Sequence, residues 1–212
     1  MTRDDARAIV ARRLGNRGTS LDTEIVAELQ QAQLELELLP ELPWFLSYRD
    51  VSLTTTANQA YVTLPATFIM VDEDKGVRIT DSSGNRQPLI KTKHAQALNR
   101  EWFNDNQDAA LPEVYDIQNL LMYVYPTPDA AYTLEVSYFK QDDALSAVST
   151  ENNWLKYAPD LLIAYAGGKV ALFNGFPEQY PVWDAEYKRA LARMWAQSVA
   201  RTEADNSAYL GG

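Results

Sequence analysis

The chain has 212 residues with 19 basic and 29 acidic side chains, a formal charge of −10, and no cysteine. Disulfides, thiolate metal sites and a cysteine nucleophile are therefore excluded. The acidic balance argues against nucleic acid as a tightly bound partner, because a phosphate backbone would need a basic patch working against the overall field. An acidic wall that lines a DNA path without binding DNA stays compatible with this charge.

Composition predicts a folded protein. The absence of a secretion signal and of long apolar runs predicts synthesis in the cytoplasm and no membrane segment. Apolar residues make up 46% and charged residues 23% of the chain, as in ordinary globular proteins. The first residues, MTRDDARAIVARRL, lack the continuous apolar run of a secretion signal. No later stretch approaches the roughly 18 consecutive apolar residues that a membrane-spanning helix requires.

The first 39 residues show helical spacing in two stretches. Thr2 is suited to cap a first helix over residues 2–14, with Asp4 and Asp5 in its opening turn. A second helix is predicted from residue 20 until Pro40 ends it. Both are too short to be stable alone in water, so each must bury its apolar stripe against another element.

The period changes to alternation between residues 51 and 140, which predicts strands. Residues 51–55 and 61–64 are expected to form one hairpin, and residues 77–80 and 86–90 another around a turn at residues 81–85. Residues 93–103 interrupt the series with a predicted short helix, and residues 104–112 with an exposed loop.

A proline turn separates two further strands. Residues 120–125 are apolar on both faces, and Pro126 and Pro128 stop the ladder after Tyr125. From Tyr132 onwards apolar residues alternate with polar ones, so the second strand is expected to have one solvated face; the polar positions are Thr133, Glu135 and Ser137.

Helical spacing returns after residue 152. Pro159 suits the first turn of a helix that is apolar almost all round, and we expect this helix to be central. Gly167 and Gly168 within it would be explained by close contact with another helix, because each costs roughly 1 kcal/mol against alanine. A long helix follows over residues 181–202. The last residues have no periodicity and are expected to be extended and flexible unless a partner orders them.

These elements predict an α+β fold. Residues 1–48 and 153–203 are expected to form a helical bundle from both chain ends, residues 49–152 an inserted antiparallel β-rich lobe, and residues 204–212 a flexible docking tail.

No pattern typical of a catalytic site stands out. The carboxylate pairs are the candidates for acid and base chemistry: Asp142 with Asp143, the run at residues 72–74, and Glu35 with Glu37. Their spacing does not bring them onto one face, and a solvated acidic surface is the favoured interpretation. His94 is the single histidine, which rules out a site with two histidine ligands. We therefore expect no enzyme activity, cofactor or metal.

The order of the pieces is more telling than any one of them. An acidic helix is followed by a Pro-Trp boundary, a first strand, a hairpin and a Leu-Pro-x-x-Phe corner in LPELPWFLSYRDVSLTTTANQAYVTLPATFIMVD. A Tyr-Pro-x-Pro turn follows in PEVYDIQNLLMYVYPTPDAAYTLEVSYFKQDDALS, and a helix in NNWLKYAPDLLIAYAGGKVALF. Over roughly residues 5–200 the chain resembles the head-to-tail adaptor proteins of tailed bacteriophages, the connector subunits beneath the portal, including the tail accessory and tail tubular types.

This resemblance implies a virion structural protein at the head-to-tail junction, made in the cytoplasm of a host bacterium. Its copies would form a ring, a dodecamer in such adaptors, that binds the portal protein above and the tail nozzle or other tail proteins below. DNA would pass through the lumen without specific binding.

Two sets of residues take roles from the resemblance. By position, the portal-docking segment would be Asn206, Ser207, Ala208, Tyr209, Leu210, Gly211 and Gly212. The tail-facing or intersubunit residues would be Tyr125, Pro126, Pro128 and Tyr132.

Two alternatives stay open. The chain could be a tail-completion or tail-tube virion protein with the same broad content of helices and strands. It could also be a cell-wall hydrolase of virion entry that uses Asp142 and Asp143.

Overall fold

A computed structural model describes residues 1–15, 19–92, 109–146 and 150–210, with side chains described as far as Arg201. The chain divides into two compact units. Unit 1 consists of Met1–Leu46 and Asp142–Gly212, and unit 2 of Ser47–Gln141. Residues 142–152, which the sequence placed with the β-rich lobe, therefore lie in the unit that holds the helices.

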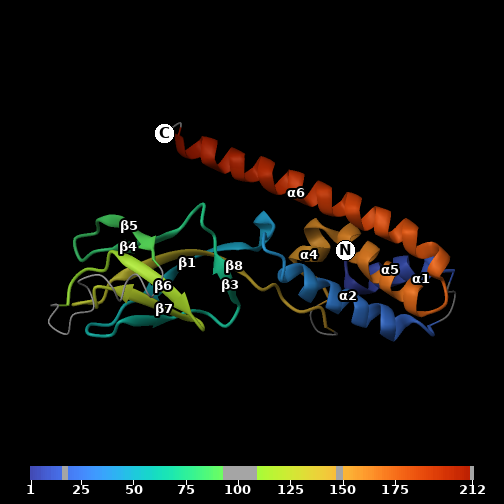
Figure 1. Ribbon diagram of the computed structural model, residues 1–212, viewed down its shortest axis with the longest axis horizontal. Helices are drawn as coiled ribbons and strands as arrows, with labels where there is room; N and C mark the ends of the chain where they lie inside the picture. Colours follow the sequence, from blue (N-terminus) through green and yellow to red (C-terminus); the bar gives the residue numbers. More distant parts are fainter. Residues whose placement is uncertain (16–18, 93–108, 147–149, 211–212) are drawn as a thin grey trace. The chain divides into compact units, whose positions relative to one another are not determined.

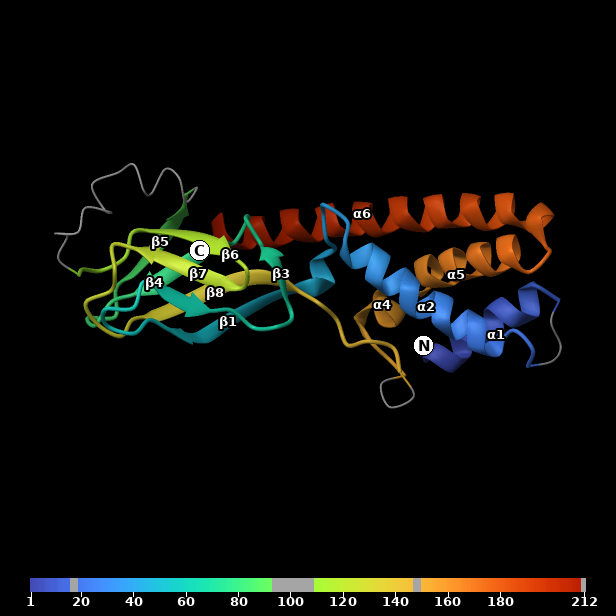
Figure 2. The same ribbon diagram turned by 60° about the horizontal axis from the view of Figure 1, so that its bottom comes forward.

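Unit 1 is helical in its described part. Its central helix is α5, and α1, α2, α4 and α6 all contact α5 (Figures 1 and 2). The helices are α1 (Arg3–Arg13), α2 (Asp22–Glu37), α4 (Asn153–Tyr157), α5 (Pro159–Phe173) and α6 (Tyr180–Leu210), with single 3-10 turns at Trp44–Leu46 and Pro177–Gln179. The predicted central position of α5 is confirmed by these contacts.

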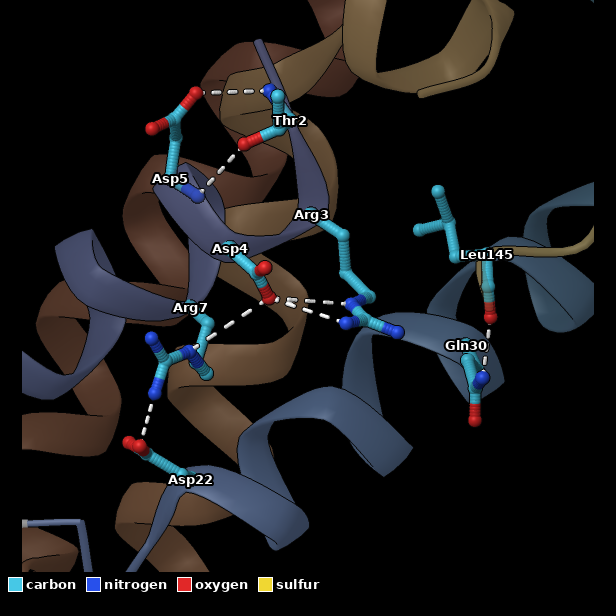
Figure 3. Close-up of polar contacts among 8 residues, drawn as sticks. All are labelled: Thr2, Arg3, Asp4, Asp5, Arg7, Asp22, Gln30 and Leu145. Atoms are coloured by element: carbon cyan, nitrogen blue, oxygen red, sulfur yellow. Dashed lines mark hydrogen bonds and ion pairs between the residues drawn. The ribbon is translucent and has the colours of Figure 1, made fainter. Parts of the chain in front are cut away.

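Local sequence signals account for the starts of two helices. The Thr2 hydroxyl accepts a hydrogen bond from the Asp5 N–H, and the Asp5 carboxylate accepts one from the Thr2 N–H (Figure 3). This reciprocal capping satisfies two N–H groups that a helix start leaves without partners. Pro159 stands in the first turn of α5, where its fixed φ suits a helix and its missing N–H costs nothing.

The two glycines of α5 mark its closest approach to α6. A Cβ atom built on Gly167 would lie 2.5 Å from the Trp183 ring, and one on Gly168 would lie 3.3 Å from the Trp183 Cβ. The Trp183 side chain fills the space that the missing Cβ atoms leave, and it is 2% exposed. The predicted reason for keeping both glycines, close helix contact, is confirmed.

The last helix runs further than the sequence predicted. We expected it to end near residue 202 and residues 204–212 to be extended, yet α6 continues to Leu210. No proline or glycine interrupts the chain between Pro181 and Gly211, so the backbone hydrogen bonds of the helix propagate to the end of the described residues. The lack of an apolar stripe after residue 202 was therefore a poor signal for an extended segment.

Unit 2 is a curled β-sheet whose strands are far from sequential order (Figure 1). The order of the described strands is β1-β8-β4-β5-β6-β7-β2, and β3 also pairs with β8. They span β1 (Ser47–Thr54), β2 (Tyr61–Thr63), β3 (Phe68–Val71), β4 (Val77–Thr80), β5 (Arg86–Lys91), β6 (Val114–Gln118), β7 (Leu121–Tyr125) and β8 (Thr133–Lys140).

One of the two predicted hairpins is correct. β4 and β5 pair antiparallel around Asp81, whose carboxylate accepts hydrogen bonds from the N–H groups of Ser83 and Asn85. The predicted hairpin of residues 51–55 with 61–64 is wrong, because β1 pairs with β8 and β2 pairs with β7. Alternation identified both strands but carried no information about their distant partners.

The predicted solvated face of β8 is wrong at two of its three polar positions. Thr133 is exposed as predicted, but Glu135 is 8% exposed and Ser137 3%, so the strand is covered on both faces there. β8 lies in the interior of the sheet, and β1 on one side and β3 and β4 on the other complete its ladder. The apolar face of the same strand, with Leu134 and Val136, contributes to the core of unit 2.

The mixed α and β class is thus confirmed. The sheet is not wholly antiparallel as predicted, since β5 and β6 pair in parallel through Ile90 and Lys91. The predicted short helix over residues 93–103, with His94, lies outside the described residues, as does the predicted loop as far as residue 108.

The α5–α6 contact makes Gly167→Ala a sharp test of unit 1. We expect the substitution to lower the free energy of unfolding by about 1–3 kcal/mol, because the new methyl group overlaps the Trp183 ring, although alanine favours a helix. Chemical denaturation measures this change. In a double-mutant cycle with Trp183→Leu the two effects should be strongly non-additive; additive effects would show that the ring does not set the contact.

Candidate functional site

A buried network of hydrogen bonds holds the segment of the chain that returns to unit 1 from unit 2. The Glu37 carboxylate at the end of α2 accepts hydrogen bonds from the Trp154 indole N–H at 3.0 Å, the Gln33 amide at 3.0 Å and the Asp142 N–H at 3.2 Å. Asn152 donates to the Gln33 side-chain oxygen at 3.0 Å. These contacts join α2 to a segment more than a hundred residues later, and all five residues are buried.

Asp142 organises the start of α4 within the same network. Its carboxylate accepts hydrogen bonds from the N–H groups of Asn153 at 2.6 Å and Trp154 at 3.3 Å. The Asn152 side chain caps the helix by accepting from the Leu155 N–H at 2.9 Å. The first N–H groups of α4 are thus satisfied by side chains, as a buried helix end requires.

Burial raises the pKa of Glu37 above its ordinary value of 4.5, because removal from water disfavours the charged form. The hydrogen bonds from Gln33, Trp154 and Asp142 oppose this shift, and the negative charge of Asp142 adds to it. A folded chain therefore binds a proton at Glu37 more readily than an unfolded one does. This carboxyl group makes the network sensitive to pH above 4.5.

An aromatic cluster holds the chain where it leaves unit 1. The Trp44 N–H donates to the Ser198 hydroxyl at 3.0 Å, and the Arg201 guanidinium lies 3.8 Å from the centre of the Trp44 ring. Phe45 packs edge-to-face on Trp154, with ring centres 5.1 Å apart. The exit of the chain and its return are therefore fixed against the same buried tryptophan.

Figure 3 shows how the first helix is tied to the rest of unit 1. Arg7 lies between Asp4 and Asp22, and its guanidinium donates to the Asp22 carboxylate at the start of α2. Further along α2, the Gln30 amide donates to the backbone carbonyl of Leu145. The polar contacts of α1 and α2 thus serve the packing of unit 1.

The carboxylate pairs proposed from the sequence are not brought together. Asp142 is buried and caps the start of α4, whereas Asp143 is exposed. Glu37 is buried, but Glu35 is exposed, and the Tyr165 hydroxyl lowers its pKa. These geometries do not offer two carboxylates that converge on an open cleft, as glycoside hydrolysis needs.

The run at residues 72–74 serves a turn in unit 2. Asp72 is 5% exposed and accepts a hydrogen bond from the Ser47 hydroxyl at 2.6 Å, and Lys75 lies 3.4 Å from its carboxylate. Glu73 pairs with Lys91 on β5 at 2.5 Å. Both acidic side chains have local partners that stabilise the fold of the sheet.

A cleft of about 650 Å³ opens in unit 1 between α1, α5 and α6. Arg13 on its wall pairs with Glu186 at 2.6 Å, and Arg193 pairs with Asp160 at 3.2 Å. The lining combines charged and apolar side chains: Met1, Ile9, Arg13, Asp160, Ile163, Glu186, Arg189, Ala192 and Arg193. Such a lining suits contact with a protein surface better than acid and base chemistry.

The predicted tail-facing or intersubunit residues are core residues of unit 2. Tyr125, Pro126, Pro128 and Tyr132 are all buried. The Tyr132 hydroxyl donates to Asp129 at 2.5 Å, and burial raises the pKa of Tyr125 to about 12. Their side chains support the turn, and their predicted contact role stays a prediction.

The predicted portal-docking residues lie at the end of α6. Residues 206–210 form its last turns, and residues 211–212 lie outside the described part of the chain. Before this segment, Ser198 and Arg201 of α6 both contact Trp44. α6 runs on past α5 (Figure 2), and at the usual rise its nine residues after Arg201 span roughly 13 Å.

The described residues hold no cluster of three or more side chains suited to bind a metal ion. In the same part of the chain, no helix combines the length and apolar character needed to cross a bilayer.

Comparison with protein families decides the class. The model of the SU10 adaptor protein family matches residues 1–209. The chain belongs to this family. The predicted resemblance to bacteriophage adaptor proteins is thereby confirmed at the level of the family, and the tail accessory or tail tubular type stays a prediction. No curated protein matches the chain.

An SU10 adaptor protein is a structural component, so contact surfaces matter more than catalytic groups. Sequence inspection missed two such surfaces: the cleft lined by Arg13, Arg189 and Arg193, and a group of arginines around Glu135 in unit 2. The residues of each surface are far apart along the chain. Only the packing of α1 and α6 on α5, or the pairing of β1, β4, β5 and β8, brings them together.

The pH dependence of unfolding tests the network at Glu37. Because the folded pKa is raised, the contribution of Glu37 to the free energy of unfolding is greatest below 4.5 and falls as the pH rises through the folded pKa. Glu37→Gln should remove this decrease, and denaturant titrations across this range would measure it. Glu35→Gln is the control, since the lowered pKa of Glu35 places its effect below 4.5.

Glu37→Gln removes the charge but keeps an acceptor oxygen, whereas Glu37→Ala removes the hydrogen bonds as well. It leaves the Trp154 indole and the Asp142 N–H without their acceptor, so we expect a loss of about 3 kcal/mol at neutral pH. A loss as small as that of an exposed substitution would show that the network does not hold the returning chain.

Proposed function

We propose that this SU10 adaptor protein is the head-to-tail adaptor of a phage virion. Its copies form a ring beneath the portal protein, join the capsid to the tail and continue the channel for DNA. The family match over residues 1–209 is the observation that carries this proposal. The ring number, a dodecamer in the resembling adaptors, is part of the same proposal.

The net negative charge of the chain supports the proposed DNA channel. A formal charge of −10 per copy is multiplied around a ring, and it repels the phosphates of DNA that must slide through. We therefore propose that DNA passes the lumen without specific binding. The protein acts through shape and contact, with no cofactor.

Ring closure requires two different complementary surfaces on each copy, because a cyclic ring uses heterologous interfaces. The cleft of unit 1 and the sheet of unit 2 are candidates for such surfaces. In this proposal the helices of the two chain ends act as one bundle, and unit 2 meets tail proteins or a neighbouring copy.

The end of α6 is the proposed portal-docking segment. In this proposal the last part of α6, which continues as a helix to Leu210, presents its side chains to the portal. Residues 206–212 would bind the portal, with Tyr209 and Leu210 as anchors, since an aromatic and an aliphatic side chain supply most of the apolar contact available there.

The alternative within the virion is a tail-completion or tail-tube protein. It differs from an adaptor in one measurable property, because only an adaptor contacts the portal directly. A cell-wall hydrolase using Asp142 and Asp143 is disfavoured by the capping role of Asp142 and the exposure of Asp143.

Truncation tests the docking segment. A chain ending at Glu203 should keep the unfolding midpoint of the full chain, because it retains Trp183, Ser198 and Arg201, which contact the rest of unit 1. It should lose binding to purified portal rings by about tenfold or more. Removal of residues 211–212 alone is the control for end effects. Unfolding of the truncated chain, or unchanged portal binding, would contradict the assignment.

The free subunit should be largely monomeric in sedimentation experiments. The ring is proposed to close on the portal, which gathers copies at high local concentration and orders their ends. Stable rings formed without the portal would contradict assembly by this route.

A further inference from the structure

Three arginines from three strands gather around one carboxylate on a face of unit 2. Glu135 on β8 stands directly opposite Arg78 on β4, and Arg49 on β1 stands opposite Ser137, two residues further along β8. Arg86 is brought in by β5, where it pairs with Thr80. The register places these side chains on the face opposite the core residues Leu134 and Val136, because neighbouring positions in a strand alternate.

The carboxylate satisfies only one of the three. Arg49 donates to Glu135 at 2.6 Å, whereas Arg78 and Arg86 lie 3.9 Å away, beyond hydrogen-bond distance. One negative charge among three positive charges leaves a local surplus on a chain whose overall charge is −10. The Arg78 and Arg86 side chains are 45% and 62% exposed, so this surplus faces solvent.

Arg78 and Arg86 have N–H groups that are available to bind an external group. Within the part of the chain that the structure describes, Arg78 and Arg86 make no hydrogen bond and no ion pair other than the loose ones to Glu135. A guanidinium carries a planar set of N–H groups that matches a carboxylate in a two-point hydrogen bond. Glu135 holds the arginines near one another, and an external anion can complete their coordination.

The surroundings favour a protein over a nucleic acid as the occupant. Arg86, Pro88 and Ile90 alternate with the buried Leu89, so all three lie on the outer face, and Ile90 is 68% exposed. Arginine beside exposed apolar side chains is typical of the core of a protein interface, in which lysine and acidic residues are depleted. A phosphate backbone makes no use of an exposed isoleucine.

We propose that this face, defined by Arg78, Arg86 and Ile90 around Glu135, docks a carboxylate-rich surface of a second copy of the same chain. Charge complementarity points to that partner, because every copy carries a net excess of acidic side chains. A ring needs unlike surfaces on the two sides of each subunit, and a basic face meeting an acidic one fulfils this need. The inference rests on the proposed ring and names one of its contacts.

Cross-linking between isotopically distinct copies tests the contact without the portal. Equal amounts of ¹⁴N- and ¹⁵N-labelled R86K chain, at about 1 mM and low salt, are treated with a carbodiimide, which joins amines to adjacent carboxylates. Mass spectrometry should find mixed-isotope links at the introduced lysine about fivefold more often than at Lys75 or Lys91, and these links should fade with salt. Links at the introduced lysine to Glu135 of the same copy alone would overturn the proposal.

Assembly on the portal provides the second readout. R78Q/R86Q should retain the Arg49–Glu135 pair, and with it the unfolding midpoint, yet form incomplete rings on portal complexes seen by electron microscopy. K75Q/K91Q removes the same charge from unit 2 away from this face, together with the ion pairs to Asp72 and Glu73. Its unfolding midpoint is measured alongside, and the folded control should complete the ring. Complete rings with R78Q/R86Q would overturn the inference while leaving the adaptor role intact. Absence of portal binding by the unaltered chain would instead refute the proposed function, and the cross-links would still decide the contact.

Nucleic acid is the competing occupant. Fluorescence anisotropy with a short DNA duplex should show no binding that depends on these arginines. Binding by the unaltered chain that R78Q/R86Q abolishes and K75Q/K91Q keeps would overturn the proposal in favour of a DNA contact.

Discussion

The buried hydrogen bonds of Glu37 are the constraint on which unit 1 depends. Unit 1 is built from two segments that a whole sheet separates in sequence, so something must fix the returning segment against the first. Glu37 does this by accepting hydrogen bonds from the Asp142 N–H and the Trp154 indole, and Phe45 packs on the same tryptophan. The chain therefore leaves and re-enters the helical unit at defined positions, although a carboxylate is costly to bury.

Helical packing and the sheet give an adaptor two kinds of surface. Unit 1 offers a cleft with charged walls, and unit 2 offers a face where arginines exceed carboxylates. Neither surface contains converging catalytic groups among the described residues. A role that relies on contact with other proteins is consistent with a family of structural adaptors.

Local signals allowed part of this structure to be predicted. The cap at Thr2, the start of α5 at Pro159 and the role of Gly167 each depend on a few neighbouring residues or on one close contact. The pairing of β1 with β8 could not be predicted, because alternation says which face is buried and nothing about the partner strand. The burial of Glu135 follows only once arginines from three other strands cover it, so the polar pattern of β8 was misleading.

The most direct test of the account is a cryo-electron microscopy map of the phage particle, at a resolution that allows this sequence to be fitted. We predict a closed ring of copies between the portal and the tail, with the end of α6 against the portal and the arginine face of each unit 2 against the next copy. A map that places the chain in the tail tube, or as separate copies away from the portal vertex, would contradict the account.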